Sequence, residues 1–170
     1  MNKAFMIALA GILGVVLLCL CAFAETNKLT DSAAQDLLIK REVETAVSML
    51  QAIHVQHQRG KTTIEEAKEL GATLLRELRY GADGYFWADT TEGVNVVLYG
   101  RKDVEGRNRL EDKDLKGTYY VKAFLNKANI GGGYVEYWFS KQGETTPLPK
   151  RSYVLLFKPF GWVIGTGYYR

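Results

Sequence analysis

A short run near the C-terminus combines a cation with hydroxyl groups at strand spacing. Lys150 and Arg151 are followed by Ser152 and Tyr153, in front of an apolar run. Side chains alternate between the two faces of a strand, so only one of the two cations can face a binding site. We expect it to be Lys150, with Ser152 beside it, which would suit recognition of a small carboxylate. The alternative is that both cations are solubilising charges next to a hydrophobic strand.

Aromatic side chains could form the walls of the same site. Tyr85 and Trp87 share one face of an expected strand, and Phe86 points to the other. A tyrosine can bury its ring and still direct its hydroxyl at a ligand, although each tyrosine could equally be a core residue. Arg101, in a polar loop, could meet an anion or remain in solvent. The predicted ligand-binding residues are Lys150, Tyr85, Trp87, Tyr99, Tyr137, Ser152, Tyr153 and Arg101.

Patterns typical of enzymes and metal sites are absent from the sequence. It contains no Gly-x-Ser-x-Gly elbow, phosphate-binding glycine loop or His-Glu-x-x-His motif. His54 and His57 are three residues apart on a predicted helix, but no carboxylate or cysteine cluster in the sequence completes a metal site beside them. Asp112 and Asp114 lack the remaining positions of a calcium loop. We therefore predict a protein that is not an enzyme and needs no cofactor or metal.

The first 24 residues have the features of an export signal. Lys3 is the only charged residue before Glu25, the segment between them is apolar, and Ala22-Phe23-Ala24 fits a signal-peptidase site. We predict cleavage after this site and a single mature domain of residues 25–170, periplasmic or secreted. An uncleaved anchor on the outer face of the inner membrane is the alternative, because about 20 apolar residues can span a bilayer. Both cysteines fall in this segment, so the mature domain would contain none.

Two helices are expected before any strand. Ile39, Val43, Ala46, Leu50, Ile53 and His57 recur at helical spacing, which predicts a long helix with one buried stripe that ends by Gly60. Thr30 or Asp31 is the expected N-cap. Thr62-Thr63-Ile64-Glu65 has the pattern of a capping box, which indicates a second helix that stops at Gly81.

The rest of the chain has the period of strands. A hairpin is expected over residues 85–88 and 94–99, followed by a polar loop and a short helix that ends near Asn129. Further strands are expected at 134–139, 153–157 and 162–168, with a loop from 141 to 149. The fold class is therefore α+β. The net charge of +3 argues against a nucleic-acid-binding protein.

The order of these elements resembles the single Cache extracytoplasmic ligand-binding sensor domain (sCache_2 type), a PAS-like module. Four sequence words carry the resemblance, which extends over residues 28–170: Asp83-Gly84-Tyr85-Phe86-Trp87, Asp114-Leu115-Lys116-Gly117, Pro149-Lys150-Arg151-Ser152-Tyr153-Val154 and Gly161-Trp162-Val163-Ile164-Gly165-Thr166-Gly167-Tyr168. The resemblance implies a five-stranded antiparallel sheet with the long and second helices packed on it. It also implies a small organic ligand on the other face, with Lys150 at a pocket position.

The sequence departs from that family in two places. Members typically have His-Pro after the second strand, whereas this chain has Tyr99-Gly100, so the identity of the ligand does not carry over. Members also continue into a transmembrane helix and a cytoplasmic output, which we do not expect here. The resemblance implies a sensor module for a small organic acid or similar metabolite that passes its ligand state to a membrane receptor, or self-associates, through the long helix. The alternative is a secreted structural or interaction protein with no small ligand.

Overall fold

The computed structural model describes the backbone of residues 3–170 and the side chains from residue 30 onward. The predicted export signal lies outside the described side chains, and its cleavage stays a prediction. Within the described part of the chain, no helix has the length and apolar character needed to cross a membrane. The chain divides into two compact units, residues 1–37 and residues 38–170, and all contacts discussed below belong to the second unit.

The long helix α1 (Lys3–Gln58) buries the stripe that its sequence predicts. Five of the six predicted stripe residues, Ile39, Val43, Ala46, Leu50 and Ile53, are buried. His57 is half-buried near the end of the helix, where its Nδ1 lies 2.9 Å from the Thr62 carbonyl oxygen. The predicted N-cap at Thr30 or Asp31 is wrong, because α1 begins at Lys3 and passes through both positions. Residues 25–29 (Glu-Thr-Asn-Lys-Leu) contain no proline or glycine that would stop the helix before position 30.

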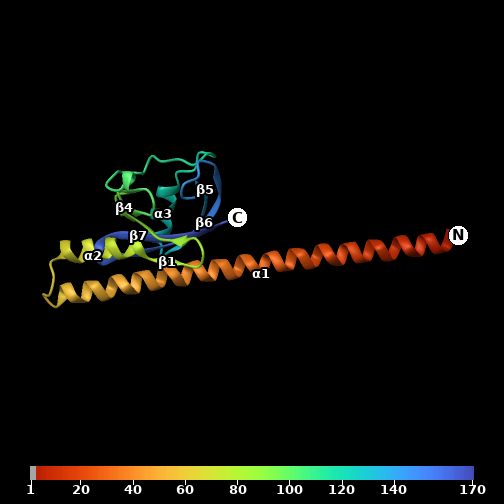
Figure 1. Ribbon diagram of the computed structural model, residues 1–170, viewed down its shortest axis with the longest axis horizontal. Coiled ribbons are helices and arrows are strands. Elements are labelled where there is room, and N and C mark those ends of the chain that lie inside the picture. The colour runs from red at the N-terminus through yellow and green to blue at the C-terminus, as the bar shows by residue number, and fades with distance from the viewer. Residues whose placement is uncertain (1–2) are drawn as a thin grey trace. The chain divides into compact units, whose positions relative to one another are not determined.

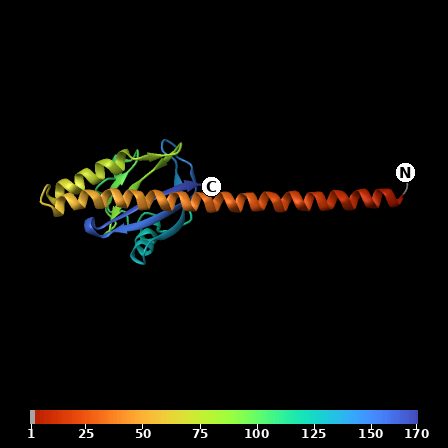
Figure 2. The same cartoon turned by 90° about the horizontal axis from the view of Figure 1, so that it is seen from below.

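Helix α2 (Ile64–Glu77) starts with a capping box, as predicted, but its reciprocal pair is Thr63 and Glu66, one residue after Thr62 and Glu65 of the sequence pattern. The Thr63 hydroxyl accepts a hydrogen bond from the Glu66 N–H at 3.1 Å, and the Glu66 carboxylate accepts one from the Thr63 N–H at 2.8 Å. This reciprocal pair satisfies two backbone donors that a helix start otherwise leaves open. Helix α2 lies beside the last turns of α1 (Figures 1 and 2). It buries Ala67, Gly71 and Leu75.

Five strands form one antiparallel sheet in the order β4-β3-β7-β6-β5. Its strands are β3 (Trp87–Thr90), β4 (Asn95–Leu98), β5 (Gly133–Ser140), β6 (Pro147–Phe157) and β7 (Trp162–Tyr169). A small separate hairpin pairs β1 (Arg79–Tyr80) with β2 (Gly84–Tyr85). The remaining elements are helix α3 (Tyr120–Asn129) and two short 3-10 helices, η1 (Lys102–Val104) and η2 (Lys158–Phe160). The predicted α+β fold with a five-stranded antiparallel sheet is therefore confirmed.

The strand β6 begins six residues before the predicted position. Two prolines, Pro147 and Pro149, favoured a loop in the sequence because proline cannot donate a ladder hydrogen bond. In the structure β7 ends opposite Lys150, so β6 extends beyond its partner on that side. The Pro149 carbonyl, which points toward β7, accepts a hydrogen bond from the Arg170 N–H at 2.9 Å. The nitrogens of both prolines therefore lie beyond the end of β7, where no carbonyl of that strand would need a hydrogen bond from them.

The sheet separates two hydrophobic cores. One core lies on the side of α1 and α2, and the other lies under α3, on the opposite face (Figure 1). Phe86 belongs to the first core, whereas its neighbours Tyr85 and Trp87 belong to the second, as strand alternation predicts. The second core is rich in tyrosine and contains the candidate site.

Candidate functional site

Lys150 is the most unusual residue in the core under α3. Its side chain is 2% exposed, and its Nζ donates hydrogen bonds to the hydroxyl of Tyr85 at 2.5 Å and of Tyr169 at 3.5 Å. Three aromatic rings surround the ammonium group, with centroids at 4.2 Å (Tyr85), 4.7 Å (Tyr169) and 5.4 Å (Phe139). Within residues 30–170 no carboxylate forms an ion pair with it. Burial lowers the pKa of Lys150 to about 7, although the charge of Asp83 acts in the opposite direction.

The tyrosine hydroxyls around Lys150 form a connected network. The hydroxyl oxygens of Tyr137 on β5 and Ser152 on β6 lie 3.1 Å apart, and both residues are close to Lys150. The Tyr169 hydroxyl lies 3.3 Å from that of Tyr85 and donates to the Ser140 carbonyl at 2.9 Å. Burial raises the pKa of both Tyr85 and Tyr137, so both phenols stay protonated and can donate hydrogen bonds. The network holds the ammonium group with neutral oxygens only.

A second cation, Arg109, reaches the same core from the loop before α3. It is 5% exposed, and its Nη2 donates to the Tyr120 hydroxyl at 3.0 Å. Asp112 lies 3.1 Å from its Nε, and the buried Asp89 lies 3.7 Å from its Nη1. Burial raises the pKa of Asp89 to about 6, against the opposing effects of Arg109 and the Asn95 amide. The charge of Arg109 is thus matched by protein carboxylates, whereas that of Lys150 is not.

These groups line a small cavity between the sheet and α3. Its volume is about 10 Å³, close to the space that one water molecule occupies. Its walls come from six elements of the fold and from the loop that carries Arg109. The lining residues are Tyr85, Trp87, Leu98, Arg109, Tyr120, Phe124, Tyr137, Phe139 and Lys150. We call this the inner cavity. Its donors and cations could bind a small anion while the aromatic walls exclude water.

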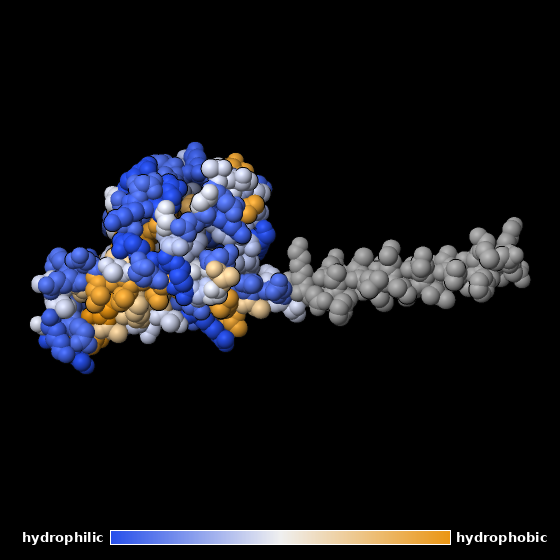
Figure 3. All heavy atoms as spheres, viewed as in Figure 1, coloured by the Kyte–Doolittle hydropathy of each residue, from blue (hydrophilic) through white to orange (hydrophobic). Residues whose placement is uncertain are grey.

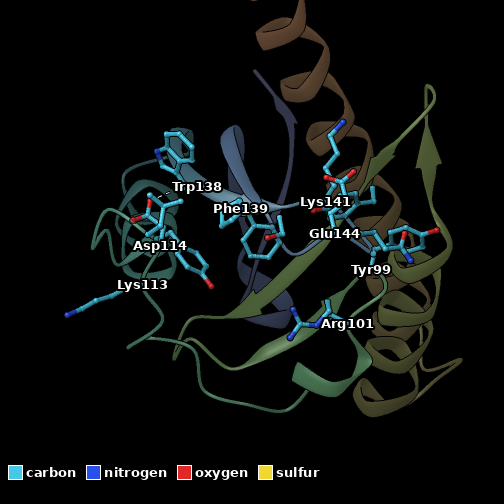
Figure 4. A pocket seen from close by; sticks show the side chains of 15 residues that line it. Tyr99, Arg101, Lys113, Asp114, Trp138, Phe139, Lys141 and Glu144 are labelled. Carbon is cyan, nitrogen blue, oxygen red and sulfur yellow. Dashed lines mark hydrogen bonds between the residues drawn. The ribbon is translucent and has the colours of Figure 1, made fainter.

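A larger cavity of about 240 Å³ opens next to it. Tyr85, Tyr120 and Phe139 line both, so these three side chains separate the inner cavity from this outer cavity. Figure 4 shows Phe139 near its centre, with Asp114 and Trp138 on one side and Tyr99 and Glu144 on the other. The loop that joins β5 and β6 forms part of its rim, and Gln142 of that loop packs against Gly100, after β4. A ligand could reach Lys150 from the outer cavity only if one of these three side chains moved. A separate cavity of about 160 Å³ is lined by Lys150 and Tyr137 directly.

The structure brings most of the predicted site residues together. Lys150, Tyr85, Trp87 and Tyr137 line the inner cavity, and Ser152 bonds to Tyr137 directly behind it. As predicted, Lys150 and not Arg151 points to this face; Arg151 points to the opposite face of β6 and pairs with Glu136 at 2.6 Å. Two predicted residues, Tyr99 and Arg101, line only the outer cavity.

Two of the predicted residues are placed differently from the expectation. Tyr153 packs in the core on the side of α1 and α2, edge-on to Tyr134, so its predicted place in the pocket is wrong. Adjacent strand residues point to opposite faces, and Tyr153 therefore cannot accompany Ser152. Arg101 lies on the rim of the outer cavity, where it makes two hydrogen bonds of 3.0 Å to Asp103, so its charge is already compensated.

Sequence reasoning missed Arg109, Tyr120 and Tyr169. Arg109 stands in a polar loop with Arg101 and Arg107, and nothing in the local pattern indicates that it alone is buried. Tyr169 is the last residue of β7 and shares the face of Gly165 and Gly167, so strand alternation could have placed it beside Lys150. Among the described residues, no group of three or more His, Cys, Asp or Glu side chains could hold a metal ion.

Comparison with known proteins places these features in a family. The model of the family described as "Single Cache domain 2" matches residues 32–170. The sensor histidine kinase MctS of Rhizobium johnstonii is 30% identical over 142 residues, which cover 82% of this chain and 31% of the kinase. The methyl-accepting chemotaxis protein McpP of Pseudomonas putida is 30% identical over 130 residues, covering 75% of this chain and 24% of the receptor. The chain thus spans less than a third of the length of either relative.

Solved structures agree with the family assignment. A periplasmic sensor domain of a chemotaxis protein is 30% identical, with a TM-score of 0.78 over 81% of this chain and 96% of that one. A Cache chemosensory domain whose structure is described as the basis of carboxylic acid recognition is 29% identical, with a TM-score of 0.78 over 81% of this chain and 95% of that one. By sequence, fold and the residues matched, this chain belongs to the single Cache domain 2 family of sensor domains.

Proposed function

We propose that this domain is an extracytoplasmic sensor module that binds a small organic carboxylate in the inner cavity. The observation that carries the proposal is Lys150, a fully buried ammonium group with no carboxylate partner among the described residues. A buried charge is stable only when it is paired or neutralised. An anionic ligand would supply the missing counter-ion, and the phenols of Tyr85 and Tyr137 would donate the additional hydrogen bonds.

The size of the inner cavity favours a short ligand. Its volume of about 10 Å³ is that of one water molecule, so even a short carboxylate requires Phe139 or Tyr120 to move toward the outer cavity. The carboxylic acid recognition described for the similar Cache domain supports the same ligand class. No nucleophile, base and orienting group are arranged around the cavity for catalysis, and we assign the domain a binding role.

The test is calorimetry of the purified domain with propanoate and with propanamide, which has nearly the same shape but no charge. We expect propanoate to bind and propanamide not to bind, because only the carboxylate can pair with Lys150. The variant Lys150→Met should lose propanoate binding by a factor of about 30 or more, because a truncated charge pair costs ~2–5 kcal/mol. Lys113→Met, on the rim of the outer cavity, is the matched control and should bind normally. Equal binding of acid and amide would contradict the proposal.

We also propose that the domain passes its ligand state on through a contact made by its helices. Leu70 and Leu74 lie four residues apart on α2 and are 48% and 37% exposed. Hydrophobic surface gathers over this end of the α1 and α2 pair in Figure 3. Exposed apolar surface of this kind is typical of contact sites. The occupant would be a second copy of the domain or a membrane receptor, and the secreted interaction protein that needs no ligand remains the alternative.

Crosslinking in cells tests this contact. A photoreactive residue in place of Thr45 or Ser48, which are exposed on α1, should give a crosslinked species whose yield changes when the carboxylate is added. The same residue at Lys127, exposed on α3 on the opposite face of the sheet, is the control. Recovery of uncrosslinked monomer under every condition would instead support a passive binding role.

A further inference from the structure

Asp89 and Asn95 bury two acceptor oxygens that no protein donor reaches. Asp89 on β3 is 0% exposed, and Asn95, its cross-strand neighbour on β4, is 2% exposed. Among the described residues, neither the Asp89 Oδ2 nor the Asn95 Oδ1 has a hydrogen-bond partner. A buried carboxylate normally accepts hydrogen bonds at both oxygens, because burial removes the water that would otherwise stabilise its charge. Two open acceptors on adjacent side chains therefore need an explanation.

The orientation of the Asn95 amide is fixed by three acceptors. Its Nδ2 donates to the Asp89 Oδ1 at 2.8 Å, and to the carbonyl oxygens of Ala88 at 3.2 Å and Val97 at 3.3 Å. Turning the amide over would place its oxygen against these three oxygens, so the Asn95 Oδ1 remains an acceptor without a donor. A proton bound to the Asp89 carboxyl would remove the buried charge and add a donor where the two side chains have only open acceptors.

The cation next to Asp89 has other partners. The Arg109 Nη1 lies 3.7 Å from the Asp89 Oδ1, which is beyond hydrogen-bond distance. The hydrogen bonds of Arg109 go instead to the Tyr120 hydroxyl at 3.0 Å and to Asp112 at 3.1 Å. The Asp89 carboxylate thus has one hydrogen bond, from a neutral amide. Burial raises the pKa of Asp89 to about 6, so this carboxyl can exchange a proton in mildly acidic conditions while Arg109 stays in place.

Arg109 connects Asp89 to the inner cavity, because Arg109 and Lys150 both line it. An arginine stays charged throughout this pH range, so protonation of Asp89 leaves the guanidinium with one counter-charge fewer. Asp112 cannot replace that counter-charge fully, because its side chain is 40% exposed and water screens it. The cavity wall therefore becomes more positive when Asp89 takes up a proton. The groups around Asp89 are the charged Arg109 and Asp112, the phenol of Tyr120, the neutral Asn95 on β4 and the apolar Val163 on β7.

We propose that Asp89 is a positioning residue that couples anion binding in the inner cavity to the uptake of a proton, so that the domain binds its ligand more tightly as its surroundings become acidic. The coupling rests on the proposed carboxylate site and concerns the regulation of that site. It is reciprocal, because an anion held by Arg109 and Lys150 adds negative charge near Asp89 and favours its protonated form. The domain would thus respond to its ligand and to the acidity of the same compartment together.

The test is calorimetry of propanoate binding between pH 7.5 and 5.5, with the parent and with Asp89→Asn, which has nearly the shape of the protonated carboxyl. As the pH falls, the affinity of the parent should rise by about five- to tenfold more than that of the variant, because a nearby charge shifts a carboxyl pKa by about one unit or more. At pH 7.5 the variant should bind more tightly than the parent. Lys150 gains a proton as the pH falls through about 7, but it does so in both proteins, so the difference between them isolates Asp89.

Urea unfolding tests the proton on Asp89 without any ligand. The pKa of about 6 lies above the ordinary value of 3.8, so between these values the folded domain binds a proton that the unfolded chain does not. The cost of the ionised carboxyl is present above pH 6 and is relieved as the pH falls toward 4. From pH 7.5 to 4.5 the folding equilibrium constant of the parent should gain about thirtyfold on that of Asp89→Asn. Glu111→Gln, which changes an exposed carboxylate of the same loop as Arg109, is the control and should keep the pH dependence of the parent in both measurements.

Each outcome decides between the proposals. A stability difference between parent and Asp89→Asn that does not change with pH would show that Asp89 stays ionised, with water completing its hydrogen bonds, and would overturn the inference. Propanoate affinities with the same pH dependence in parent and variant would also overturn it, and would leave the carboxylate site standing. If propanoate binds to neither protein at any pH, the proposed function fails, and the coupling fails with it.

Discussion

Replacement of Lys150 by methionine should stabilise the unliganded domain at neutral pH, although it removes a residue from the core. Burial lowers the pKa of Lys150 from 10.5 to about 7. At ~1.4 kcal/mol per pKa unit, keeping the buried ammonium charged below pH 7 costs about 5 kcal/mol. Methionine fills a similar volume without charge, and it sacrifices the two hydrogen bonds to Tyr85 and Tyr169, worth about 1 kcal/mol each. The net expectation is a gain in the free energy of unfolding of about 3 kcal/mol at pH 6.

The sign of the pH dependence is opposite to that of a lysine in an ion pair. Between pH 7 and about 10 the unfolded chain keeps the proton on Lys150, while the folded domain releases it. The unfolded state then binds more protons, so the stability of the parent rises with pH by up to about 1.4 kcal/mol per unit. The penalty is fully present below pH 7 and is relieved as the pH rises through this window.

Urea unfolding of parent and Lys150→Met at pH 6, 7, 8 and 9 measures this difference. The advantage of the variant should be largest at pH 6 and shrink to near zero by about pH 9. Lys127→Met, a change of an exposed lysine on α3, serves as the control and should alter stability by ~0.5 kcal/mol or less. A variant that is less stable than the parent at pH 6, or a difference that does not change with pH, would refute the reasoning.

Three further predictions follow from other parts of the molecule. Arg109→Met should destabilise the domain by about 3–5 kcal/mol in urea unfolding, because it leaves the buried Asp89 without its cationic partner. The exposed pair is the control: Arg101→Met should change the free energy of unfolding little, and similar values for the two variants would contradict the burial argument. Gly165→Ala should lower the free energy of unfolding by about 1–3 kcal/mol and weaken ligand binding, because the new methyl group collides with the Trp87 indole. Unchanged stability and binding would show that the ring can move aside. Exported protein should begin at or near Glu25 by intact-mass analysis, and membrane-bound protein that retains Met1 would establish the anchor instead.

Periodic and local signals in the sequence were sufficient to predict most of the fold. The α1 stripe and the capping box of α2 depend on residues that are close together in the chain. The stripe is buried as predicted except at His57, and the box lies one residue later than its sequence pattern. The start of α1 was not predicted, because the cap signal at Thr30 carries weight only if the preceding residues disfavour a helix. The start of β6 was missed for a different reason. Prolines are tolerated in that part of the strand only because β7 ends before them, and the sequence does not show where β7 ends relative to β6.

In the candidate site, too, the residues that follow a local pattern were predicted, and those that depend on distant parts of the chain were not. Strand alternation placed Lys150 and Ser152 on one face and, applied consistently, would also have excluded Tyr153. Arg109 could not be identified in this way, because its burial depends on Asp89, which is 20 positions earlier in the chain and on another element. Periodicity predicts which face a residue occupies, but it cannot tell which of several loop arginines enters the core.

The contact between Trp87 and Gly165 bears on how such a domain could change its ligand range. Gly165 has no side chain with which to touch a ligand, yet it determines where the indole lies in the cavity wall. A substitution at Gly165 would shift the Trp87 ring and so change the shape of the cavity, without replacing any residue that lines it. Variation in β7 is therefore a route to new specificity that a search confined to cavity-lining residues would overlook.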